Sequence, residues 1–142
     1  MKFKSKIYLT YDDILSMTKN LEYEVAKFKP DLIVGISRGG IVPALHLSHS
    51  LDVPLETINW KTRDGDLREH NCSISDQINA GETVVFVDDI NDSGHTFTQI
   101  REMYRGGVYV SLIEKTTTKF ESNFSVMRMD DERWIVFPWE KD

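Results

Sequence analysis

The sequence predicts an α/β protein with a mostly parallel, twisted sheet flanked by helices, and three observations support this prediction. Apolar runs such as DLIVGIS (31–37) and TVVFVDD (83–89) are bounded by turn residues, which is typical of strands buried on both faces. These runs alternate with segments whose apolar residues recur at helical spacing. The 142 residues contain no internal repeat and no Pro- or Ser-rich linker, so we expect one domain over residues 1–142.

The first helix is predicted from its capping signal. Thr10 and Asp13 stand at the spacing of a capping box, and the apolar periodicity that follows is expected to end before Pro30. Further helices are predicted at residues 41–51 and 96–104. Strands are predicted at residues 31–37, 53–60, 83–89, 108–115 and 132–139.

The stretch from Lys61 to Thr83 is polar and has few candidates for the core. A mobile flap or hairpin over about residues 61–82 is therefore expected.

Composition narrows the class of protein. A net charge of −6 argues against general nucleic-acid binding, which needs a basic face to neutralise phosphates. The single cysteine, Cys72, allows no intramolecular disulfide and fits a reducing compartment. No apolar run approaches the roughly 18 residues of a membrane span, and no signal peptide is visible at the N-terminus. We expect a cytoplasmic protein.

A ligand site is expected where two strands end. The strands ending at Ser37 and Asp88 both run into glycine-containing loops. In open α/β sheets, ligands gather outside the carboxyl ends of the strands. The two loops are therefore expected to lie at the site.

The segment DDINDSGHT (88–96) suits a sugar phosphate. Asp88 and Asp89 can accept hydrogen bonds from vicinal hydroxyls or hold a hydrated Mg²⁺. Downstream, the N-terminus of a helix offers amides to a phosphate, and Gly94 lets the backbone approach closely. Two acids after a strand also occur in phosphatase-like and receiver-like metal sites, or in a solvated turn with a helix cap. The complete pattern, an apolar strand, two acids, two spacers and then Asp-Ser-Gly-x-Thr, favours ribose 5-phosphate over these alternatives.

The segment VVFVDDINDSGHTF (84–97) resembles the phosphoribosyl-pyrophosphate signature of type I phosphoribosyltransferases, and most closely that of the bacterial xanthine-guanine group. GISRGGIVPA (35–44) is similar to the pyrophosphate loop of that family, and ERWIVFPWE (132–140) to its purine-holding tail. This resemblance implies the family's fold, with a small hood over the base site. It also implies transfer of phosphoribosyl to a purine.

For the sugar end of the donor, the resemblance assigns the ribose hydroxyls to Asp88 and Asp89, with Asp89 contacting the Mg²⁺ cofactor. Asp92 would lie near the purine N7 as proton acceptor or charge stabiliser, and a helix-capping role remains open for it. The 5′-phosphate would be held by Ser93, Gly94, His95 and Thr96. Pyrophosphate would be held by Ser37, Arg38, Gly39, Gly40 and, from the flap, Arg68. A solvated charge remains an open alternative for each arginine.

For the base, the resemblance assigns Lys115 to the 6-oxo oxygen, with Trp134 and Ile135 stacking on the ring and offering backbone carbonyls. The purine-binding tail would span about residues 115–140. Such a lysine favours oxopurines, namely guanine, xanthine or hypoxanthine, over adenine.

The chain departs from the family pattern at three places. Asn91 replaces an apolar residue, His95 stands where glycine is common in the closest relatives, and TTTKF (116–120) replaces a proline-containing turn.

The alternative function is a non-catalytic regulator that senses phosphoribosyl pyrophosphate or a nucleotide. Relatives also suggest a homo-oligomer, a dimer or tetramer, with Trp60 and Tyr104 as exposed interface candidates.

Overall fold

The computed structural model describes residues 5–62, 66–130 and 132–141 and contains two sheets and four helices within them. In chain order the elements are β1 (Lys6–Tyr8), α1 (Tyr11–Ala26), β2 (Leu32–Ser37), α2 (Ile41–Leu51), β3 (Leu55–Lys61), β4 (Leu67–Arg68), α3 (Cys72–Asn79), β5 (Val84–Asn91), α4 (His95–Tyr104), β6 (Val108–Lys115), β7 (Phe124–Met129) and β8 (Trp134–Val136). Residues 63–65 of the predicted flap and residue 131 of the predicted tail lie outside the described residues.

The main sheet has six strands in the order β4-β3-β2-β5-β6-β7, and every neighbouring pair is parallel except β3 and β4. The predicted α/β class with a mostly parallel sheet is thus confirmed. After β2 the chain first adds β3 on one side and later β5 on the other, so the connection direction reverses between β2 and β5. A crevice outside the carboxyl ends of the strands is expected at such a switch point.

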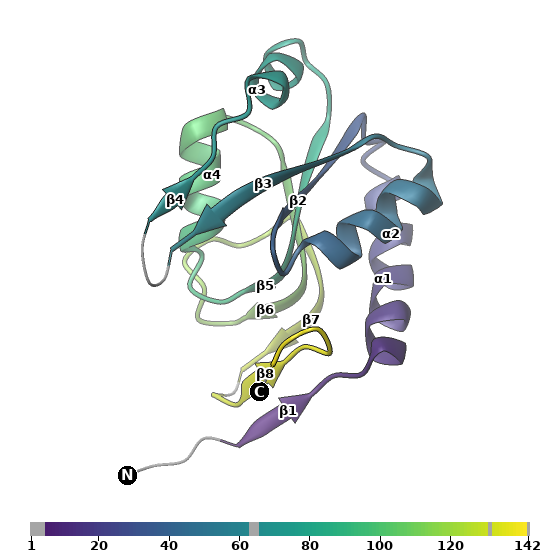
Figure 1. The fold of residues 1–142 in the computed structure, drawn as a ribbon, viewed down its shortest axis with the longest axis vertical. Helices are drawn as coiled ribbons and strands as arrows, with labels where there is room; N and C mark the ends of the chain where they lie inside the picture. The colour runs from purple at the N-terminus through teal and green to yellow at the C-terminus, as the bar shows by residue number, and fades with distance from the viewer. Residues whose placement is uncertain (1–4, 63–65, 131, 142) are drawn as a thin grey trace.

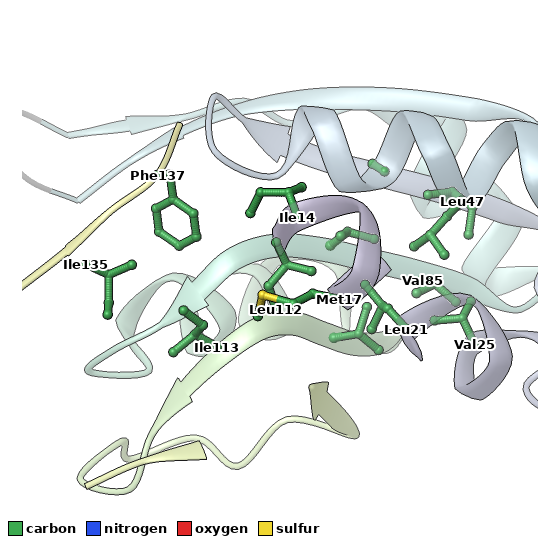
Figure 2. Close-up of a cluster of buried hydrophobic side chains, with 14 of the residues drawn as sticks. Ile14, Met17, Leu21, Val25, Leu47, Val85, Leu112, Ile113, Ile135 and Phe137 are labelled. Carbon is green, nitrogen blue, oxygen red and sulfur yellow. The ribbon is translucent and has the colours of Figure 1, made fainter. Parts of the chain in front are cut away.

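Helices cover both faces of the main sheet, with α1 and α2 on one side and α3 and α4 on the other (Figure 1). Within β5, Val85 and Val87 face the α1/α2 cluster, whereas Val84 and Phe86 face the α3/α4 cluster. Figure 2 shows the first cluster, where Leu21 of α1 meets Leu47 of α2. Because these strands are buried on both faces, they are continuous apolar runs in the sequence.

The first helix begins where its capping box predicts. The Thr10 hydroxyl accepts a hydrogen bond from the Asp13 amide at 3.0 Å, and the Asp13 carboxylate accepts one from the Thr10 amide at 2.8 Å. These reciprocal bonds satisfy two otherwise unpaired amides of the helix start. None of the helices among the described residues has the length and apolar character needed to cross a membrane.

Strand β5 is longer than predicted. Its pairing with β2 stops at Val87, but its pairing with β6 continues to Asn91 opposite Glu114. The extension adds Ile90 and Asn91 to a strand whose prediction already included Asp88 and Asp89. This extension leaves the two carboxyl groups on an edge that β2 no longer covers.

The predicted flap contains more structure than its polar composition indicated. β3 and β4 form the expected antiparallel hairpin, but α3 follows it and its Ile74 is completely buried. The short helix escaped prediction because only two of its residues, Ile74 and the partly buried Ile78, pack against the core.

The expectation that Trp60 and Tyr104 are exposed interface residues was wrong. Trp60 is buried in the α3/α4 cluster and donates its indole N–H to Gln99 Oε1 at 3.0 Å. The Tyr104 hydroxyl accepts a hydrogen bond from the Asn71 amide at 2.9 Å and donates one to Glu69 O at 3.1 Å. Both side chains therefore fasten the base of the hairpin to α4.

A second, two-stranded sheet joins the two ends of the chain. β1 pairs in parallel with β8, so that Ile7 lies opposite Ile135. In Figure 1 this pair stands apart from the main sheet, close to its edge strand β7. Ile135 and Phe137 turn into the α1/α2 cluster, which anchors the pair (Figure 2).

Candidate active site

The glycine loop between β2 and α2 meets the end of β5 at the switch point. A Cβ at Gly39 would lie 2.7 Å from Asp89 Oδ1, and a Cβ at Gly40 would lie 3.0 Å from the Asp88 Cα. Only glycine therefore lets the β2–α2 loop approach β5 this closely. The peptide bond between Ser37 and Arg38 in this loop is cis.

Asp88 and Asp89 form a partly buried pair of carboxyl groups. Asp88 Oδ1 accepts a hydrogen bond from the Asp89 amide at 2.8 Å, and Asp89 Oδ1 accepts one from the Ile90 amide at 2.7 Å. Burial raises the pKa of Asp88 well above its usual value, and the charge of Asp89 adds to this effect. Burial also raises the pKa of Asp89, with a further contribution from the charge of Glu140. Binding partners that favour the ionised form are cations and hydroxyl donors.

A cavity of about 270 Å³ lies on one side of these acids. It is lined by Trp60, Lys61, Thr62 and the continuous segment Asp88, Asp89, Ile90, Asn91, Asp92, Ser93, Gly94, His95, Thr96 and Phe97. Gly94 is the N-cap of α4, adopts a left-handed conformation with φ 93° and has no side chain to cap the helix. Ser93 Oγ accepts a hydrogen bond from the first helical amide, that of His95, at 3.2 Å. The following first-turn amides, of Thr96 and Phe97, belong to residues that line the smaller cavity, which suits an anion.

A larger cavity of about 630 Å³ lies on the other side. Its lining consists of Asp89, Ile90, Asp92, Lys115, Thr116, Thr117, Met129, Asp130, Glu132, Arg133, Trp134, Ile135, Phe137 and Glu140. This volume suits a small organic ligand. Asp89, Ile90 and Asp92 line both cavities, so a ligand in one would reach a ligand in the other at these residues.

All three residues that the sequence assigned to the base line the larger cavity. Lys115 Nζ donates a hydrogen bond to the backbone oxygen of Arg133 at 3.1 Å, which ties the end of β6 to the tail. Trp134 is 48% exposed and lines the larger cavity, while Ile135 is buried in the core. Ile135 can therefore present its backbone to a ligand but has its side chain engaged in packing.

The residues predicted to bind pyrophosphate lie in two separate places in the structure. Ser37, Arg38, Gly39 and Gly40 lie at the end of β2 beside Asp89, although they line neither cavity. Arg68 lies in β4, where its Nε is 3.0 Å from Asp66 Oδ1, and it also lines neither cavity. The structure thus brings the β2–α2 loop to Asp89 but leaves Arg68 outside both cavities, on the edge strand β4.

Several lining residues were missed from the sequence. Lys61 and Thr62 reach the smaller cavity because β3 runs beside β2, and Asp130 and Glu132 reach the larger one because β7 runs beside β6. Spacing along the chain carries no signal for such neighbours. Glu132 and Glu140 both belong to the quoted tail ERWIVFPWE (132–140), although neither was assigned a role of its own.

The Asn91 departure has a structural explanation. Its side chain is buried and donates a hydrogen bond to Glu114 Oε1 on β6 at 2.9 Å. A polar residue at position 91 is thus matched by a polar residue opposite it. His95, the second departure, is exposed at the first position of α4.

The acid pair fits the Mg²⁺ that the fold family implies. The described residues contain no cluster of three or more His, Cys, Asp or Glu side chains that could form a complete metal site. Mg²⁺ usually takes one or two carboxylates and completes its shell with water and substrate oxygens. Two adjacent carboxyl groups that line the smaller cavity, Asp88 and Asp89, supply that share of the ligands.

The chain was compared with protein families and with known proteins. The family model for the phosphoribosyl transferase domain matches residues 7–141. A solved purine phosphoribosyltransferase from Pyrococcus horikoshii Ot3 is 33% identical with a TM-score of 0.83, covering 97% of this chain and 96% of that one. The xanthine-guanine phosphoribosyltransferase of Cereibacter sphaeroides (strain ATCC 17025 / ATH 2.4.3) is 26% identical over 94% of this chain and 86% of its own length.

A third similarity concerns the fold alone. The Helicobacter pylori xanthine-guanine-hypoxanthine phosphoribosyltransferase is 21% identical with a TM-score of 0.73, covering 94% of this chain and 92% of that one. Together with the matched family model and the contact between the β2–α2 loop and Asp89, these similarities establish the class of the protein: it belongs to the phosphoribosyl transferase domain family.

Proposed function

We propose that this phosphoribosyltransferase transfers the 5-phosphoribosyl group from phosphoribosyl pyrophosphate to a 6-oxopurine in purine salvage. The acceptor is guanine, xanthine or hypoxanthine, and the products are the nucleoside 5′-monophosphate and pyrophosphate. One observation carries this proposal: a cavity suited to a sugar phosphate and a cavity suited to a base meet at Asp89, Ile90 and Asp92.

Each part of phosphoribosyl pyrophosphate is bound by a different group of residues. Asp88 and Asp89 accept hydrogen bonds from the ribose hydroxyls, and the α4 N-terminus with Ser93 and Thr96 binds the 5′-phosphate. Asp88 and Asp89 would also hold Mg²⁺, which neutralises charge on the pyrophosphate when bound. The β2–α2 loop, through Arg38 and the close backbone at Gly39, faces the leaving pyrophosphate.

In the reaction, the bond between ribose C1 and a pyrophosphate oxygen breaks while a purine nitrogen bonds to C1. Positive charge develops on the ribose in the transition state, and the neighbouring carboxylates stabilise it. The proton lost by the purine is accepted near Asp92, which lies between the two cavities. Lys115 donates to the 6-oxo oxygen and Trp134 stacks on the ring, so both fix the orientation of the purine.

The test is incubation with phosphoribosyl pyrophosphate, Mg²⁺ and each of guanine, xanthine, hypoxanthine and adenine, with mass spectrometric detection of the nucleotide. Product from at least one oxopurine and little from adenine is expected. Product from adenine alone would contradict the base assignment. Binding of phosphoribosyl pyrophosphate without any turnover would instead identify the non-catalytic regulator. The predicted dimer or tetramer is measured separately, by size-exclusion chromatography with light scattering.

A further inference from the structure

We propose that Asn91 and Glu114 are positioning residues that hold the phosphate-binding turn, residues 92–96, in its binding conformation. They act through the β6–β7 loop, residues 116–123, which packs against that turn. The inference rests on the proposed function, because it assigns the held turn to the 5′-phosphate.

Asn91 is fully engaged inside the protein. It is 4% exposed, and its Nδ2 donates hydrogen bonds to Glu114 Oε1 at 2.9 Å and to Phe120 O at 2.6 Å. Its Oδ1 accepts a hydrogen bond from Thr118 Oγ1 at 3.2 Å. Although Asn91 borders the smaller cavity, its amide group therefore donates to Glu114 on β6 and to Phe120 in the β6–β7 loop.

Glu114 binds the far part of the same loop. It is 2% exposed, and its Oε1 also accepts hydrogen bonds from the amide of Ser122 at 2.9 Å and the hydroxyl of Ser122 at 2.5 Å. Its Oε2 lies 3.7 Å from Arg128 NH1 on β7. Among the described residues, no buried side-chain nitrogen or oxygen lacks a hydrogen-bond partner. A polar network satisfied in this way rigidifies the segments that it joins.

The loop in turn supports the back of the phosphate-binding turn. The Lys119 amide donates a hydrogen bond to Ser93 O at 2.9 Å. A Cβ at Gly94 would lie 2.7 Å from the Phe120 amide nitrogen and 2.8 Å from Thr118 Oγ1. The turn thus sits directly on the segment that Asn91 holds, and a shift of this segment would shift Ser93 and Gly94.

Thr118 offers the sharpest test, because it lines neither cavity and its hydroxyl links the parts of the network. The hydroxyl donates to Asn91 Oδ1 and lies 3.3 Å from the Phe120 amide, from which it accepts a hydrogen bond. Thr118→Val keeps the shape and removes these bonds, whereas Thr118→Ser keeps the hydroxyl. Isothermal titration calorimetry with phosphoribosyl pyrophosphate and Mg²⁺ measures the affinity of each variant, and steady-state kinetics measures KM for each substrate.

For Thr118→Val we expect the Kd for phosphoribosyl pyrophosphate to rise about 10-fold, the effect of about one lost buried hydrogen bond. The KM for the base should change less than about twofold, and Thr118→Ser should restore the Kd to within about twofold. Asn91→Leu should raise the same Kd at least as much as Thr118→Val, since it removes all of the amide's bonds.

A lower melting temperature with an unchanged Kd in Thr118→Val would reduce the network to a structural role and overturn the proposal. Equal losses for donor and base would also overturn it. Because the readout is affinity, an unmodified chain that binds the donor without turnover still tests the positioning role. An unmodified chain that binds no phosphoribosyl pyrophosphate would overturn this inference together with the proposed sugar-phosphate site.

Discussion

The two cavities of the site are built in different ways. Apart from Trp60, Lys61 and Thr62, the smaller cavity is lined by one continuous segment, residues 88–97. The larger cavity collects residues from β5, the end of β6, the end of β7 and the tail that contains β8. A sugar phosphate can therefore be recognised by one turn, whereas a base requires segments that meet only in the folded chain.

This difference divides the expected effects of substitutions. A change confined to the segment 88–97 or to the loop beside it should affect the donor, and a change in β6 or the tail should affect the base. Residues shared by both cavities should affect the chemical step. The following predictions test this division from the largest effect to the smallest.

Asp92→Asn should have the largest effect, since Asp92 lines both cavities. We expect kcat to fall by roughly 10²–10⁴ because the purine proton loses its acceptor, with the Kd for phosphoribosyl pyrophosphate changed far less. Steady-state kinetics and calorimetry measure the two quantities. Asp76→Asn, on the exposed face of α3, is the control and should leave both unchanged. Unchanged turnover in Asp92→Asn would remove the catalytic role.

Gly39→Ala should weaken donor binding through a displacement of Asp89. Its Cβ would lie within 2.7 Å of the Asp89 carboxyl group, which must then move. Overpacking of this kind costs about 1–3 kcal/mol, so the Kd for phosphoribosyl pyrophosphate with Mg²⁺ should rise about 10- to 100-fold.

Gly106→Ala is the matched control for Gly39→Ala, because its Cβ meets only a methyl group of Ile78. Calorimetry should detect no change in donor affinity for this variant. A Gly39→Ala chain with the affinity of the parent would show that the β2–α2 loop does not set the position of Asp89.

Lys115→Met should damage the base side alone, since Lys115 lines only the larger cavity. Removal of the ammonium group should raise the KM for guanine about 10-fold and change the KM for phosphoribosyl pyrophosphate less than about twofold. Lys119→Met, on the loop that follows Lys115 and with an exposed side chain, is the control. Equal increases for the two substrates would contradict a base-reading lysine.

Asp88→Asn should have the smallest effect, a pH-dependent gain in stability. Burial and the charge of Asp89 raise the pKa of Asp88, so the folded chain keeps this proton to higher pH than the unfolded chain. The stability contributed by the carboxyl group is present below its unfolded pKa of about 4 and is lost as pH rises through the raised value.

Without Mg²⁺ or donor, the Asp88→Asn chain should thus melt at about the parent temperature at pH 4 and about 3 °C or more above it at pH 8. Thermal unfolding followed by circular dichroism measures both, with Asp76→Asn as control. The same difference at both pH values would show that the effect is not titration of Asp88.

The strands of the main sheet were predictable to the extent that their pattern is local. The run 108–115 coincides with β6, and the capping box at Thr10 begins α1 as predicted. β1 and β7 had no such local pattern. β1 has only three residues, and β7 is not a buried apolar run, because Met127 and Arg128 near its end are exposed. β1 becomes a strand only by pairing with β8, more than 120 residues away.

By itself the sequence determined the α/β class, the turn that suits a phosphate and the acids before it, because apolar periodicity, glycine and neighbouring carboxylates act within a few residues. Only the tertiary structure decided that Gly39 abuts Asp89, that Arg68 lies outside both cavities and that Asn91 finds Glu114. These contacts join residues on different strands. Their partners are set by strand order and register, which depend on the packing of the whole core and leave no mark in the spacing of a single segment.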